Sequence, residues 1–126
     1  MTPTLTILNQ YVLKGSAAQF TVAISALTAR VEHEGEHGVL SYRFFVNGPA
    51  QSAIAIIDYA TPQAWIGHHD RSMAWQEMQA LHRVATLAEV TFLGPLTDEI
   101  RLWLASSGLK AQVNSGYSLA AGFRRT

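Results

Sequence analysis

The sequence contains no cysteine, and this absence excludes several kinds of chemistry at once. Without thiols the protein has no disulfides, no thiolate nucleophile and no cysteine-held metal site. The chain is also short of charge, because charged residues make up 14% of it, whereas about 25% is usual in a soluble domain. We therefore expect another subunit to cover part of its surface.

Long apolar runs and long basic runs are missing as well. No apolar run approaches the roughly 18 residues of a membrane span, and the start "MTPTLTILNQ" lacks the basic region and apolar core of a signal peptide. The nine basic and nine acidic residues cancel, and the longest basic run is the pair Arg124 and Arg125. These features predict a soluble, cytoplasmic protein with no nucleic-acid partner and no membrane partner.

The order of the predicted elements defines the fold class of this single domain of 126 residues. Alternating apolar residues predict strands, and apolar residues three or four apart predict helices; Ser16 and Gln19 form a capping box at the first helix. In chain order we expect a strand, a helix, two strands joined by the turn "NGPAQ", a helical stretch that restarts at Asp70 or Ser72, and a fourth strand, over residues 4–13, 16–35, 39–47, 52–60, 61–87 and 89–94. This β-α-β-β-α-β order predicts an antiparallel sheet in a ferredoxin-like α+β domain.

The core is expected over about residues 4–96, and residues 97–126 form a C-terminal extension. Thr97 is predicted to cap an extra short helix. The alternation in "AQVNS" predicts an added edge strand that docks on the sheet of a partner, with Phe123 as its anchor. A disordered end is the alternative.

One face of the predicted sheet has no helix over it. Helices in such a domain cover one face, so the other face is either polar or covered. Here it combines polar residues with Leu8, Val12, Phe45 and either Ile56 or Ile57. This mixture predicts a homodimer in which two sheets pack face to face. The alternative is that the C-terminal tail folds back over that face.

The pentapeptide "HEGEH", residues 33–37, matches the zinc-hydrolase pattern H-E-x-x-H. That pattern needs a helix through all five residues, because side chains four apart then share a face. Gly35 interrupts the match, and Gly38 follows it before a stretch rich in β-branched and aromatic residues. We interpret the pentapeptide as a polar helix end with both histidines in water, and we predict no metal site.

Two short motifs resemble the antibiotic biosynthesis monooxygenase family. The matching positions are Glu36, Gly38, Leu40 to Tyr42, Asp58, Tyr59, Ala64, His68 and Ser72. The sequence is similar to the family over roughly residues 4–96. The family frequently has a second histidine directly after that serine, where this chain has Met73.

The resemblance implies a ferredoxin-like domain that pairs into a dimeric α/β barrel. Some members of the family oxygenate quinols or polycyclic phenols with molecular oxygen and without metal or flavin, and relatives degrade haem. The resemblance therefore implies a monooxygenase with no cofactor and a small aromatic substrate. The alternatives are a haem-degrading enzyme and a non-catalytic dimeric module that binds a small ligand or a protein, because fold alone does not choose among them.

Four residues are the candidates for the site: Asn9, Tyr42, Trp65 and His68. Trp65 and His68 are three apart and share a helix face, and His68 is suited to take the proton of a phenol near neutral pH. Asn9 interrupts an apolar strand face that points at the helices, and Tyr42 shares that interior. A role in packing is the alternative for each. An enzyme predicts a cavity of roughly 300 Å3 or more between sheet and helices, walled by Trp65, Tyr42 and Phe44, whereas a filled interior predicts the module.

Overall fold

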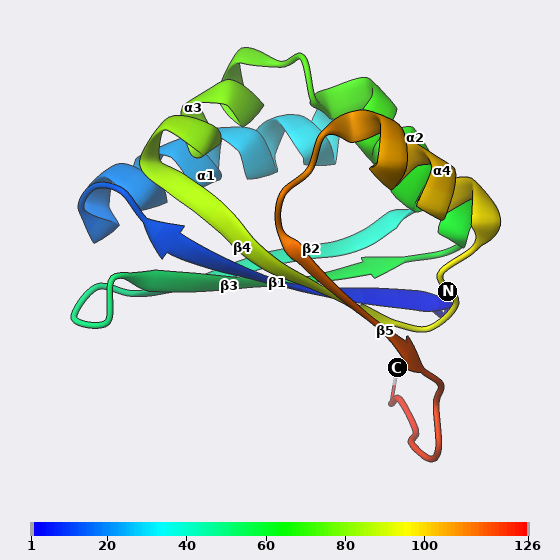
Figure 1. The fold of residues 1–126 in the computed structure, drawn as a ribbon. Helices are drawn as coiled ribbons and strands as arrows, with labels where there is room; N and C mark the ends of the chain where they lie inside the picture. Colours follow the sequence, from blue (N-terminus) through cyan, green and yellow to red (C-terminus); the bar gives the residue numbers. More distant parts are fainter. Residues whose placement is uncertain (1, 126) are drawn as a thin grey trace.

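In the computed structural model, which describes residues 2–125, five strands form one sheet and four helices lie over one of its faces (Figure 1). The elements are β1 Leu5–Leu13, α1 Ala17–Glu34, β2 Val39–Asn47, β3 Ser52–Tyr59, α2 Pro62–Ser72, α3 Gln76–Val84, β4 Ala85–Leu93, α4 Asp98–Ser107 and β5 Gln112–Tyr117. Among the described residues, no helix is both long enough and apolar enough to cross a membrane.

The strand order is β2-β3-β1-β4-β5. The first four strands pair antiparallel and have the order of a ferredoxin-like sheet, so the predicted α+β fold class is confirmed. Strand β1 lies in the middle, where Asn9 is paired with Ala55 of β3 and Val90 of β4. Its odd-numbered residues face the helices and are buried, and its even-numbered residues are more exposed.

The boundary between the last core helix and β4 differs from the prediction. The helical stretch is interrupted as predicted, with α2 ending at Ser72 and α3 beginning at Gln76. It ends at Val84 instead of Leu87, and β4 begins at Ala85 instead of Glu89. The cause is the length of β1, because its last residue Leu13 pairs with Ala85 and needs a strand opposite it. Long-range pairing therefore overrides the helical pattern of the sequence.

The C-terminal extension forms the predicted short helix capped by Thr97 and the predicted edge strand, but the pairing of that strand differs from the prediction. Strand β5 pairs parallel with β4 of its own chain and does not leave for a partner's sheet. The side-chain amide of Asn114 fixes this pairing, since it donates to Glu89 Oε1 at 3.2 Å and to Thr91 Oγ1 at 3.1 Å. The predicted anchor Phe123 is 83% exposed, so it anchors nothing within the chain. The segment after β5 lies on the side of the sheet away from the helices (Figure 1).

Helix α1 forms as its sequence predicts. Ser16 and Gln19 make the reciprocal capping box, and the apolar stripe that includes Phe20 and Leu27 is buried. The helix ends at Glu34 with Gly35 as its C-cap, so "HEGEH" straddles a helix end and both of its histidines are exposed. The helical face that the zinc pattern requires is therefore not formed.

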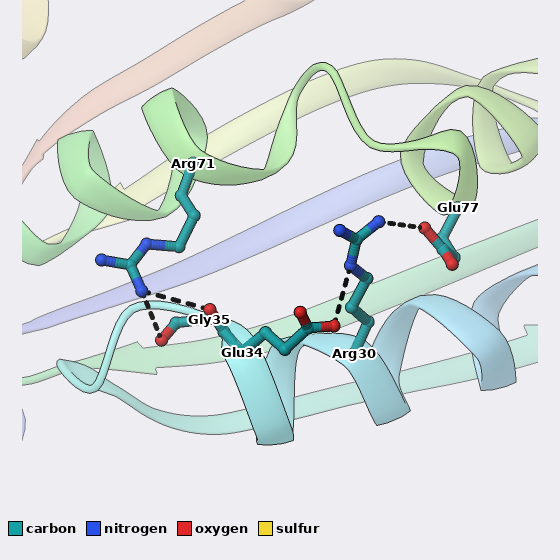
Figure 2. A network of polar contacts seen from close by, with 5 residues as sticks. All are labelled: Arg30, Glu34, Gly35, Arg71 and Glu77. Carbon is teal, nitrogen blue, oxygen red and sulfur yellow. Dashed lines mark hydrogen bonds and ion pairs between the residues drawn. The ribbon is translucent and has the colours of Figure 1, made fainter.

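A network of polar contacts joins α1 to the two helices that follow β3 (Figure 2). Arg30 Nη1 lies 2.8 Å from Glu77 Oε1 in α3, and Arg30 Nε lies 3.1 Å from Glu34 Oε2. Arg71 of α2 donates to the backbone carbonyl oxygens of Glu34 at 3.1 Å and Gly35 at 3.3 Å. These carbonyls are at the end of α1, where a cation complements the helix dipole. These contacts fix the positions of α2 and α3 relative to α1.

We expect Leu27→Ala to lower the free energy of unfolding by about 2–5 kcal/mol, because it leaves a cavity in the core. Leu27 is 0% exposed. The matched control is Val22→Ala on the same helix, where the side chain is 73% exposed and the change is expected to stay within about 0.5 kcal/mol. Denaturant titration measures both. Equal unfolding midpoints for the two variants would contradict the packing of α1 described here.

Candidate active site

A cavity of about 170 Å3 lies between the sheet and helices α2, α3 and α4. Its floor consists of side chains from β1 to β4, namely Ile7, Asn9, Tyr11, Tyr42, Ile57, Tyr59, Leu87 and Val90. Its roof comes from the helices and the segments next to them, namely Trp65, His68, His69, Met73, Met78, Leu81, His82, Trp103, Ser107, Gly108 and Leu109. All four predicted site residues therefore border one cavity.

Two features of this cavity differ from the expectation. Its volume is below the roughly 300 Å3 expected of an enzyme pocket for a drug-sized ligand. Phe44, predicted as a wall, is not part of the lining. It packs toward α1 instead, with its ring centroid 6.4 Å from that of Phe20 and 6.1 Å from that of Tyr11. The difference lies along β2, because Tyr42 meets His68 of α2, whereas Phe44 two residues further on meets Phe20 of α1.

His68 is buried in the roof, with 2% of its surface exposed. Its ring lies edge-on to Tyr42 at a centroid distance of 5.3 Å and 6.1 Å from the ring of Tyr59. Burial, with a smaller contribution from neighbouring His69, lowers the pKa of His68 to about 3. The imidazole is therefore neutral at physiological pH and can accept a hydrogen bond, but it is a weaker base than the sequence prediction assumed. The Ser72 hydroxyl donates to the His68 carbonyl at 2.7 Å and fixes this turn of α2.

His69 is the site residue that the sequence prediction missed. Its Nδ1 lies 2.7 Å from the carbonyl oxygen of Trp65, and because a carbonyl only accepts, Nδ1 carries the proton and Nε2 the lone pair. The ring stacks on Trp65 with centroids 3.9 Å apart. Burial lowers its pKa to about 4, against the opposing effects of the Trp65 carbonyl and Asp70. The four-residue spacing from Trp65 was the available signal, since such residues share a helix face.

Three buried polar atoms have no hydrogen-bond partner within residues 2–125: Asn9 Oδ1, Tyr59 OH and His68 Nδ1. Their residues all border the cavity. An unsatisfied buried polar atom destabilises a protein by about 1–3 kcal/mol, so three of them at one cavity need an explanation. A ligand that carries hydroxyl groups would supply the missing partners.

The floor supplies neutral hydrogen-bonding groups. Burial raises the pKa of Tyr11 to about 12 and holds the pKa of Tyr59 well above its usual value, so both phenols keep their protons. Asn9 Nδ2 reaches the Tyr11 hydroxyl at 3.4 Å, which is a long contact. No aspartate, glutamate, lysine or arginine is among the described residues that line the cavity. The arrangement therefore suits an uncharged, hydroxylated aromatic ligand.

Metal ligands are not gathered here. Within residues 2–125, no group of three or more histidine, aspartate or glutamate side chains is placed to hold a metal ion.

Several solved structures have a fold similar to that of this chain. MupZ from Pseudomonas fluorescens superposes with a TM-score of 0.66 at 20% identity, covering 99% of this chain and 91% of that chain. A mutant form of SnoaB, a cofactor-independent oxygenase from Streptomyces nogalater, superposes with a TM-score of 0.61 at 16% identity, covering 74% of this chain and 93% of that chain. A candidate antibiotic biosynthesis monooxygenase from Caulobacter crescentus gives 0.51 at 17% identity, covering 75% of this chain and 92% of that chain.

These similarities confirm the ferredoxin-like fold, which the chain shares with these three proteins. No family model and no curated protein match the sequence. The MupZ match covers 99% of this chain and therefore takes in the C-terminal extension, whereas the SnoaB match leaves about a quarter of this chain uncovered.

The buried histidines predict that the protein loses stability as the pH falls. In the unfolded chain a histidine titrates near pH 6.5, so between that pH and the lowered pKas of His68 and His69 the unfolded chain binds more protons than the folded one. The free energy of unfolding then falls by up to about 1.4 kcal/mol per pH unit for each histidine. The stability is fully present above pH 6.5 and declines below it.

Denaturant titrations at about pH 7 and about pH 5 measure this slope. We expect His68→Gln to reduce it by about a third to a half, since His68 is one of three histidines with a lowered pKa, together with His69 and His82. His33→Gln, at an exposed position on α1, is the matched control and keeps the full slope. A slope that does not differ between the two variants would show that His68 titrates normally in the folded protein.

Proposed function

We propose that the protein is a cofactor-independent oxygenase that acts on an electron-rich phenol or quinol. The observation that carries this proposal is the cavity bordered by Asn9, Tyr42, Trp65 and His68, where buried polar atoms lack partners among the described residues. The fold is that of SnoaB, itself a cofactor-independent oxygenase, which supports the proposal.

In this proposal the substrate supplies every electron that dioxygen takes up. The phenol loses its hydroxyl proton to His68, and the phenolate passes one electron to dioxygen. The resulting radical and superoxide combine to form a carbon–oxygen bond, and the proton returns from His68 to the peroxide. When that carbon also bears a hydrogen, loss of water leaves a carbonyl. The substrate has then lost four electrons, and the two oxygen atoms end in the product and in water.

The low pKa of His68 suits a group that takes a proton from the substrate and passes it on, and not a group that keeps the proton. An imidazolium of pKa about 3 gives up its proton readily, so the proton is available for the peroxide. The first transfer needs support from the substrate, because the nearby phenolate raises the pKa of His68 by attraction. Asn9 Oδ1 accepts a hydrogen bond from a hydroxyl group of the substrate. The buried ring of Trp65 and the half-buried ring of Tyr42 keep water from the radical pair.

A non-catalytic module that binds a small ligand is the second candidate. The small cavity and Met73 in place of a second histidine favour it. Haem degradation is less well supported, because a porphyrin has four pyrrole rings and is too large for a cavity of about 170 Å3.

We also propose that the protein is a homodimer through the helix-free face of the sheet. Large apolar side chains are exposed there, with exposed fractions of 54% for Val12, 48% for Phe45 and 39% for Ile54. The tail reaches this face where Arg124 Nη2 lies 3.7 Å from Asp58 Oδ2, and residues 2–125 leave the three apolar residues exposed. A second sheet would cover them.

We expect His68→Ala to lower kcat for quinol-dependent oxygen uptake by about 100-fold or more, since it removes the proton acceptor. Asn9→Ala removes one hydrogen bond to the substrate and is expected to raise KM by about tenfold. An oxygen electrode measures both, with protein treated with a chelator. His33→Ala, far from the cavity, is the control and retains full activity. Unchanged oxygen uptake in both site variants, with the assembly intact, would refute these roles.

Sedimentation at micromolar protein concentration is expected to give about twice the 13.8 kDa mass of the chain. Phe45→Glu places a charge in the proposed interface and should shift the protein to a monomer. Val22→Glu introduces the same charge on α1, where the side chain is 73% exposed, and should leave the dimer intact. A monomeric unaltered protein would rule out the dimer.

A further inference from the structure

We infer that the C-terminal helix restricts the cavity to ligands with a single aromatic ring, and that Trp103 is the residue that sets this limit. The inference deepens the proposed function and rests on it for the class of ligand, an uncharged phenol or quinol. It concerns the size of the ligand that the cavity accepts, and the fold alone does not determine that size.

Trp103 closes the cavity from the side of α4. Its ring lies edge-on to Trp65, with centroids 5.2 Å apart and planes at 86°, and its centroid is also 5.2 Å from that of His69. The residues at the end of α4, from Ser107 to Leu109, continue the same wall. The helix that follows the core sheet therefore forms one side of the candidate site.

This wall is held rigidly in place. Trp103 Nε1 donates to Asp70 Oδ1 of α2 at 2.8 Å, which ties the two helices together beside the cavity. The Thr97 hydroxyl caps the start of α4, and Ile100 is 0% exposed in the core. The indole is thus fixed by a hydrogen bond, by ring contacts and by its helix, so a larger ligand does not displace it easily.

The volume determines how many rings fit. An apolar cavity of about 150 Å3 is known to accept benzene, and drug-sized ligands need about 300 Å3 or more. The cavity of about 170 Å3 lies near the lower figure. A single ring with its hydroxyl groups fits, and three fused rings do not fit while Trp103 is in place.

The unpaired polar atoms at the cavity determine which substituents the ring of the ligand must carry. Asn9 Oδ1 only accepts hydrogen bonds, so it requires a donor such as a hydroxyl group. The second polar region consists of His68 Nδ1 and Tyr59 OH, whose rings lie with centroids 6.1 Å apart. A benzenediol carries two hydroxyl groups and is the simplest ligand of this description.

The test is a binding measurement under anaerobic conditions, so that no oxidation takes place. The probes are hydroquinone, with one ring, and a dihydroxyanthracene, with three. Isothermal titration of the unaltered protein is expected to show binding of hydroquinone and at least tenfold weaker binding of the three-ring probe. Trp103→Ala should gain at least tenfold in affinity for the three-ring probe, because the indole no longer occupies that space.

Two further variants separate the effect of side-chain size at position 103 from a loss of folding and from the loss of the hydrogen bond to Asp70. Trp103→Phe keeps a ring but loses the bond to Asp70, and it should still favour the single ring; Trp103→Leu stands in if Trp103→Ala does not fold. Leu102→Ala, at a position on α4 that is 71% exposed, is the matched control and should bind like the unaltered protein.

Two results would overturn the inference: binding of the three-ring probe to the unaltered protein at least as tight as that of hydroquinone, or no gain in affinity for that probe in the folded Trp103→Ala or Trp103→Leu variant. Failure of both probes to bind would overturn it as well. Ring selection without any oxygen uptake would support the inference and refute the oxygenase proposal, so the two failures are distinguishable.

Discussion

The pairing of β1 on both sides is the constraint on which the rest of the structure depends. Because β3 and β4 hydrogen-bond to β1 along its whole length, the alternation of its side chains cannot slip by one residue without turning the buried set outward. This register puts Asn9 on the face toward the helices, in a row with Ala55 and Val90. It also gives a polar residue to the floor of the cavity, opposite the histidines of α2.

Local signals in the sequence were sufficient for most of the fold. Ser16 with Gln19, and Thr97, predicted helix starts because they depend on bonds within a few residues. The start of β4 and the partner of β5 depend on strands distant in sequence, so local patterns did not reveal them. The predicted grouping of Asn9 with His68 followed from strand and helix periodicity together.

Other parts of the candidate site were not predictable from the sequence. His69 joins the cavity because α2 is turned so that residues three and four after Trp65 both face the sheet side. The packing of α2 against its neighbours sets this rotation, and the sequence of α2 alone does not reveal it. The contact of Trp103 with Asp70 likewise requires α4 to return over α2. The unsatisfied atoms of Asn9, Tyr59 and His68 destabilise the fold locally, as is usual where a protein keeps polar groups ready for a ligand.

The central claim is that these polar atoms around one small cavity bind a hydroxylated aromatic ring. A crystal structure of the protein soaked anaerobically with hydroquinone tests it most directly. The account predicts one ring between Trp65 and Tyr42, with its hydroxyl oxygens about 2.6–3.2 Å from Asn9 Oδ1 and from His68 Nδ1 or Tyr59 OH. A cavity without the ring at saturating hydroquinone, or a ring bound only elsewhere on the protein, would contradict the account.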